Sequence, residues 1–194
     1  MRSNKRKVCV AVLCAAALCA LACYHFSYPI KQDDETLAGH VREYYSRGSD
    51  SRQDVAIVLY RDGVSVGNRT YYLVDFGEDF GYVCLERGLT GRYKISHLGS
   101  GSGSFRKGIL ADGKENVFLL GGRDIAQRIK KITVTVEGGD YEMDVPDHGG
   151  TFLVSAPVAG HIGQSYVHLE DIAFYDETGA EITGEYDLSG GGFG

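Results

Sequence analysis

The chain has 194 residues, enough for one medium-sized domain or two small ones. It holds 26 acidic and 20 basic side chains, and because four of the basic ones precede position 8, the remainder carries 16 basic against 26 acidic residues, a net charge of −10 with histidine neutral. This balance argues against nucleic acid as a partner and against flat binding to an anionic bilayer, since both require clustered Lys and Arg.

The amino-terminal segment has the pattern of a targeting sequence. Residues 1–7, MRSNKRK, contain four basic residues and no acid, and residues 8–26, VCVAVLCAAALCALACYHF, contain no formal charge. A run of this length can cross a hydrocarbon core as a transmembrane helix. Because basic residues precede the run and acidic residues follow it, we predict a cytoplasmic amino terminus and an extracytoplasmic remainder.

Two other fates of this segment stay open. The triplet Ala20-Leu21-Ala22 offers the small residues at which a signal peptidase cuts, so the segment can be a cleaved export signal. Cys23 follows these small residues, where bacterial lipoprotein processing attaches lipid, although the order of leucine and small residue departs from that signal. The apolar run continues into Tyr24 and Phe26, aromatics that suit a membrane interface, and this favours a retained single-pass anchor of the cell membrane.

Cysteine usage agrees with export but not with a disulfide scaffold. Four of the five cysteines lie in the apolar segment, and Cys84 stands alone in the exported region. Its setting, YVCLERG, predicts a buried thiol on a strand rather than a reactive one.

Residues 27–53 are predicted to form a short juxtamembrane helix and a linker. Leu37, Val41 and Tyr44 or Tyr45 recur at helical spacing behind an acidic start, which predicts a helix over about residues 34–46. The polar residues 48–53 then form the linker.

From residue 54 the pattern is that of a mainly β, antiparallel protein. Short runs rich in Val, Ile, Tyr and Phe are separated by Gly, Asp and Asn. We predict a first β unit over residues 54–121 and a second over 122–186, each a β-sandwich or partly open barrel, although one larger β domain would give the same string of strands. Strict alternation puts Ile132, Val134 and Val136 on a core face. The glycine-rich residues 187–194 are predicted to form a disordered tail.

The stretch SHLGSGSGSFRKG, residues 96–108, is the part of the chain most like a ligand-binding loop. Gly99, Gly101 and Gly103 start a dinucleotide-binding fingerprint, but no glycine occupies its third position, and the P-loop spacing also fails. Ser104 and Lys107 have the Ser-x-x-Lys spacing of serine acyl enzymes, yet on a strand these positions point to opposite faces. We predict a mobile connection between two strands, GRYKISHL (residues 91–98) and SFRKGIL (residues 104–110).

Histidines and carboxylates supply no recognised motif either. A metal site could be assembled on paper, but its spacing belongs to no common metal site. The residues concerned are Asp147, His148, His161, His168 and Glu170. The acidic clusters at 33–35, 78–79 and 170–171 fall in predicted turns or helix caps. We therefore expect no catalytic residue, no metal and no cofactor.

Several segments together resemble a poorly characterised class of membrane-anchored or lipid-anchored exported proteins of Gram-positive bacteria. They are DVAIVLYRDG, GYVCLERGLTGRYKISHLGSG, VFLLGGRD, IKKITVTVEGGDYEMDV, TFLV and DIAFYDETGAEI. The resemblance implies a β-rich ectodomain behind one amino-terminal anchor, and it implies no activity and no site residues. We expect a membrane-anchored extracytoplasmic binding or accessory module of the cell envelope, with an envelope protein as partner. The alternatives are a cell-envelope hydrolase or other exported enzyme, and a secreted or lipid-anchored form of the same module.

Overall fold

The computed structural model describes residues 2–31, 36–47, 55–60, 62–111, 116–159, 167–168 and 171–193, with side chains from Ala11 onward. Among the residues whose side chains are described, no helix combines the length and the apolar character needed to cross a membrane. The elements are α1 (Arg2–Ser27), α2 (Leu37–Ser46), β1 (Val58–Leu59), β2 (Val64–Val66), β3 (Arg69–Phe76), β4 (Asp79–Arg87), β5 (Tyr93–Gly101), β6 (Phe105–Ala111), β7 (Asn116–Arg123), β8 (Lys131–Val136), β9 (Gly139–Asp144), β10 (Thr151–Val158), β11 (Ile172–Tyr175) and a 3₁₀ turn (Thr183–Glu185).

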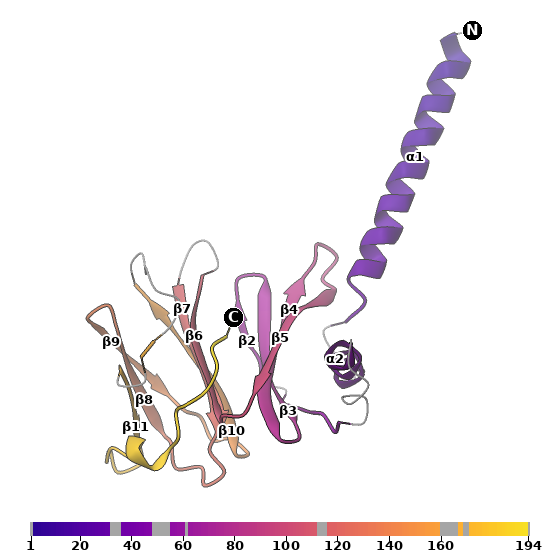
Figure 1. Ribbon diagram of the computed structural model, residues 1–194. Helices are drawn as coiled ribbons and strands as arrows, with labels where there is room; N and C mark the ends of the chain where they lie inside the picture. Colours follow the sequence, from indigo (N-terminus) through magenta and orange to yellow (C-terminus); the bar gives the residue numbers. More distant parts are fainter. Residues whose placement is uncertain are drawn as a thin grey trace.

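The strands form three antiparallel sheets that lie side by side as layers (Figure 1). Sheet A has the order β1-β3-β4-β5, with β2 also paired to β3; sheet B has the order β10-β7-β6; and sheet C has the order β11-β8-β9. Helix α2 covers the outer face of sheet A, while α1 projects away from the layers (Figure 1). Sheet B is therefore the middle layer and is covered on both faces.

Alternate residues of β7 belong to two different cores. Phe118 and Leu120 pack between sheets B and C, and Leu119 packs between sheets A and B. All three are fully buried, because successive side chains of a strand point to opposite faces and both faces of sheet B are covered. The predicted alternation in β8 is confirmed, since Ile132 and Val134 lie in the core between sheets B and C.

The predicted boundary between two β units does not divide the chain. Strand β7 falls mostly in the predicted first unit, yet it pairs along its whole length with β10 of the predicted second unit. The two glycines that suggested a boundary, Gly121 and Gly122, lie inside β7. A Cβ at Gly121 would come within 2.8 Å of both Leu73 and Leu153, so close packing between sheets explains the absence of a side chain there.

The carboxyl-terminal segment, residues 188–193, also differs from its prediction as a disordered tail. It runs beside β6, and Leu188 and Phe193 are only 7% and 6% exposed. The backbone N–H of Lys107 donates to the carbonyl of Gly191 at 3.4 Å, and the N–H of Phe193 donates to the carbonyl of Lys107 at 3.1 Å. These two bonds form a parallel bridge to β6.

Helix α2 corresponds to the predicted short helix, although it begins at Leu37 and residues 32–35 lie outside the described part of the chain. Leu37, Val41 and Tyr45 form its buried face. The ring of Tyr45 stacks on Phe76 of β3 with 4.3 Å between centroids. Helical spacing thus identified the buried face, and the structure selects Tyr45 rather than Tyr44.

Candidate functional site

The carboxyl end of α1 is held against the turn between β4 and β5. The backbone N–H of Leu89 in this turn donates to the hydroxyl of Tyr24 on α1. The Arg92 guanidinium donates from Nε to the carbonyl of Tyr28 at 2.8 Å and from Nη2 to the carbonyl of Pro29. The Arg92 side chain thereby binds the carbonyl groups of the two residues that follow α1.

Backbone pairing and charge extend this junction into sheet A. Ile30 and Tyr93, the first residue of β5, exchange two backbone hydrogen bonds of 3.0 and 2.8 Å. The Tyr28 hydroxyl donates to Glu86 at 3.2 Å, and the Lys94 ammonium lies 3.4 Å from the same carboxylate and 5.0 Å from the Tyr28 ring centroid. The interactions with Tyr28 and with Glu86 raise the pKa of Lys94, so this ammonium is charged at neutral pH. The helix is therefore attached to sheet A by an ordered set of contacts.

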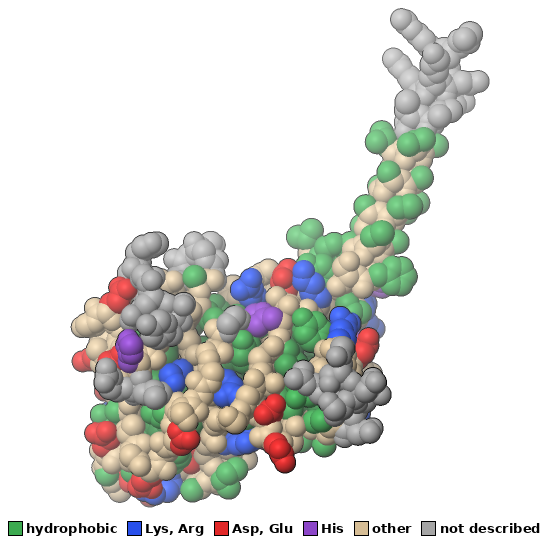
Figure 2. Space-filling view, in the orientation of Figure 1, with side chains coloured by type: hydrophobic (Ala, Val, Ile, Leu, Met, Phe, Trp, Pro, Cys, Tyr) green, Lys and Arg blue, Asp and Glu red, His purple; other side chains and the backbone are tan. Residues whose placement is uncertain are grey.

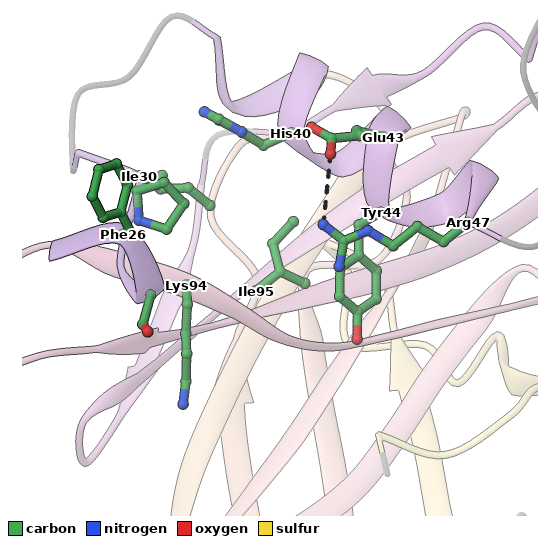
Figure 3. A pocket seen from close by; sticks show the side chains of 10 residues that line it. Phe26, Ile30, His40, Glu43, Tyr44, Arg47, Lys94 and Ile95 are labelled. Atoms are coloured by element: carbon green, nitrogen blue, oxygen red, sulfur yellow. Dashed lines mark ion pairs between the residues drawn. The ribbon is translucent and has the colours of Figure 1, made fainter. Parts of the chain in front are cut away.

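A cleft of about 420 Å³ opens beside this junction, between the end of α1, helix α2 and β5 (Figure 3). Apolar side chains and charged side chains both reach it (Figure 3). Its lining residues are Phe26, Ser27, Pro29, Ile30, His40, Glu43, Tyr44, Arg47, Lys94 and Ile95. A second cleft, of about 690 Å³, is lined by Tyr24 and Tyr28 together with residues of the β2–β3 turn, the end of β4 and the β4–β5 turn.

Two of the charged side chains that line the first cleft form an ion pair. The guanidinium of Arg47 lies 3.6 Å from the Glu43 carboxylate and 5.1 Å from the Tyr44 ring centroid (Figure 3). Both members of this ion pair are well exposed, at 66% and 71%, so they can exchange partners with little loss of free energy. Cations next to aromatic rings and carboxylates suit contacts with a polar protein segment.

From Ala11, where the description of its side chains begins, to the junction, α1 is exposed. Apolar side chains on it that are between 61% and 81% exposed are Val12, Leu13, Leu18, Leu21 and Phe26. At about 3.6 residues per turn these five positions are spread around the whole circumference of the helix. Figure 2 shows apolar side chains along the helix and basic side chains close to its base.

The glycine-rich stretch of residues 96–108 is a crossover between sheets. Residues 96–101 belong to β5 of sheet A and residues 105–108 to β6 of sheet B, so the two strands that it joins do not pair with each other. The predicted strands on either side of the connection are confirmed, but β5 extends through residues 99–101, so only residues 102–104 join the two strands. Gly99 leaves room for the ring of Tyr82, which a Cβ would approach to 2.5 Å, and Gly103 lies against the backbone of Ser189.

Arg106 holds this crossover together from inside. Its side chain is 2% exposed and donates to the carbonyls of Gly101 at 2.7 Å, Gly103 at 3.3 Å and Phe105 at 2.6 Å, and also to that of Phe80. Burial lowers the pKa of this guanidinium, but an arginine keeps its proton in a protein. Sequence reasoning missed Arg106, because nothing in a single strand distinguishes a buried arginine from an exposed one.

The Ser-x-x-Lys pair does not assemble a nucleophile. Lys107 lies on β6, and its ammonium donates to the carbonyl of Leu188 at 3.1 Å. Burial, and to a lesser extent the neighbouring charge of Arg106, lowers the pKa of Lys107. Its side chain thus contributes to holding the carboxyl-terminal segment.

Of the histidines and carboxylates considered as metal ligands, His161 and Glu170 lie outside the described residues. His148 instead lies beside a different carboxylate, with Nε2 3.5 Å from Oδ2 of buried Asp124, whose Oδ1 accepts from the Tyr186 hydroxyl at 3.0 Å. Within the described ranges no group of three or more His, Cys, Asp and Glu side chains could hold a metal ion.

Cys84 is buried, as predicted. It lies on β4 between Tyr71 of β3 and His97 of β5, which are its cross-strand partners, and its exposed fraction is zero. Burial raises the pKa of the thiol, which disfavours the reactive thiolate.

The chain matches no family model, no curated protein and no solved structure among those with which it was compared. The junction at the base of α1 and its cleft are therefore interpreted from their own geometry and chemistry.

Proposed function

We propose that this protein is an extracytoplasmic β module that α1 holds at the cell membrane, and that it acts as a binding or accessory module of the cell envelope. The observation that carries the proposal is the helix itself, which presents apolar side chains on every side to solvent. A helix that is apolar all round requires an apolar environment, and the β layers do not supply one. The bilayer is the environment that a charge-free run over residues 8–26 fits.

The flanking residues support the orientation. Four basic residues lie before the apolar run, which favours a cytoplasmic amino terminus, and the acidic remainder then lies outside. Tyr24 and Tyr28, whose rings stack at 4.7 Å, occur where the chain would leave the bilayer, a depth that tyrosine prefers. The contacts at the junction would keep the β layers at a fixed angle to the membrane and the cleft close to its surface.

A membrane-proximal segment of an envelope protein is the partner that we assign to the cleft. Its exposed Arg47–Glu43 pair and its aromatic rings offer a partner both charge signs and flat contact area. An exported hydrolase that works through a pair of carboxylates has less support at this junction, because Glu43 and Glu86 each have a cation partner.

Membrane extraction and mass determination test the anchor. The full-length chain should stay in the membrane pellet after alkaline carbonate extraction, and the purified chain should have the mass of all 194 residues. A chain that lacks residues 1–22 and is soluble would contradict the anchor and support the secreted form. A chain shortened to Cys23 with an added lipid mass would support the lipid-anchored form.

Site-specific photo-crosslinking tests the cleft. A photoreactive phenylalanine replaces Tyr44 in the cleft, and the same replacement at Tyr175 on β11 of sheet C provides the control. Crosslinking on intact cells should give a discrete envelope-protein adduct from position 44 and none from position 175. Equal adducts from both positions, or no adduct from position 44, would contradict the assignment of the cleft.

A further inference from the structure

A single β-bridge attaches the carboxyl-terminal segment to the edge of β6. Sheet B ends at β6, and residues 188–193 occupy its free edge by the parallel bridge at Lys107. The two backbone bonds of this bridge and the bond from the Lys107 ammonium to Leu188 hold the segment. Main-chain bonds to an exposed sheet edge, with a pocket for one side chain, are the features by which proteins bind extended peptides through strand addition.

The segment fits this edge because of its glycines. A Cβ at Gly190 would collide with the carbonyl oxygen of Phe105, at the start of β6. By contrast, a Cβ at Gly192 would find its nearest neighbour, the carbonyl oxygen of Lys107, at 3.5 Å, an ordinary van der Waals distance. The edge therefore selects a residue without a side chain at one position and tolerates alanine two positions later.

One aromatic side chain anchors the segment. The ring of Phe193 lies 4.6 Å from the Tyr82 ring and 5.9 Å from the Tyr71 ring, in the core between sheets A and B. His97 packs edge-on against both tyrosines, with 5.6 and 6.2 Å between centroids. Its Nε2 atom is buried and has no hydrogen-bond partner among the described residues. The segment in place thus leaves a polar group of the pocket without a partner.

We propose that the edge of β6, together with the pocket formed by Tyr71, Tyr82 and His97, is a strand-accepting site for an extended, glycine-rich segment of a partner protein that carries one aromatic side chain. Residues 188–193 of this chain occupy the site in cis and compete with that partner. The resident segment defines the chemistry of the partner: a glycine where Gly190 lies and an aromatic ring where Phe193 lies. The site goes beyond the proposed function, because none of these residues lines the cleft at the base of α1.

Displacing the resident segment from the full-length chain tests this proposal. In G190A the added methyl group should expel the segment, while G192A provides a matched control with the same chemical change. The probe is a fluorescent synthetic peptide with the sequence LSGGGF, and binding is followed by fluorescence anisotropy in detergent solution. We expect G190A to bind the peptide at least about tenfold more tightly than the wild-type chain and G192A, where the tethered segment competes at a high effective concentration.

A second variant and two altered peptides provide further tests of the proposal. F193A removes the anchor without changing the backbone, so it should also bind the peptide more tightly than wild type, and its folding is checked by circular dichroism. The peptides LSAGGF and LSGGGA should bind none of the variants. Equal affinity of wild type, G190A and F193A for LSGGGF, or no binding to folded G190A and F193A, would overturn the proposal. Dimerisation of the wild-type chain that G190A abolishes would also overturn it, because the site would then serve a second copy of this chain.

Discussion

The buried guanidinium of Arg106 offers a direct test of what holds sheets A and B together. It donates to one carbonyl of β4, one at the end of β5 and one in the connection to β6, besides that of the preceding residue. R106M keeps much of the apolar stem and removes all five N–H donors, so it isolates the hydrogen bonds from the packing volume. Hydrogen bonds from a charged donor contribute about 1.5–3 kcal/mol each and are not additive when they share one group.

We therefore expect R106M to lower the free energy of unfolding by about 3–5 kcal/mol, in the range seen when one partner of a buried charged cluster is removed. For a protein of this size about 1 kcal/mol corresponds to about 2–4 °C, so Tm should fall by about 6–20 °C in a calorimetric or circular dichroism melt. R42M, on the exposed face of α2, should change Tm by no more than about 2 °C. If R106M and R42M have the same Tm, the hydrogen bonds from Arg106 to the carbonyls do not stabilise the crossover.

Three further predictions concern single buried groups. Y186F removes the hydroxyl that donates to Oδ1 of the buried Asp124 carboxylate, and urea unfolding should report a loss of about 1–3 kcal/mol, against no comparable loss in Y175F. Burial lowers the pKa of His97 in the folded state, so the unfolded state binds the proton first as the pH drops. The free energy of unfolding should therefore fall below about pH 6.5. Urea unfolding at pH 7.5 and 5.5 should show a smaller loss of stability between the two pH values in H97Q than in the wild-type chain. Cys84, in a variant whose α1 cysteines are replaced by alanine, should react with a thiol reagent at pH 8 only after unfolding; rapid reaction of the folded chain would show that the thiol is accessible.

Local patterns predicted the parts of the fold that local physics determines. The alternation in β8 identified its core face, and helical spacing identified the buried face of α2, because each depends on residues a few positions apart. The burial of Cys84 followed in the same way from an apolar strand. None of these inferences required knowledge of which strands pair.

The errors came from glycines that lie in contacts between distant segments. Gly121 was interpreted as a boundary, and Gly190 as part of a disordered tail, yet the first makes room for Leu73 and the second for the backbone of Phe105. A glycine at a flexible position and a glycine at a close approach look alike in one sequence. The same limit hid Arg106, whose acceptors reach 26 residues back along the chain.

The cleft at the base of α1 was not predicted from the sequence. Tyr24 and Phe26 were expected to suit a membrane interface; in the structure Phe26 lines this cleft, and Tyr24 and Tyr28 line the second one. The contribution of Arg47 and Lys94 could not be foreseen, because α2 and β5 come together through the fold and not through any spacing along the chain.

Labelling of intact cells with a membrane-impermeant thiol reagent tests the central claim most directly. A cysteine replaces Glu177, which is exposed in the turn after β11, and in a second variant a cysteine replaces Ser3 before the apolar run. An anchor with a cytoplasmic amino terminus predicts that E177C is labelled on intact cells and that S3C is labelled only after lysis. Labelling of E177C only after lysis would contradict an extracytoplasmic β module.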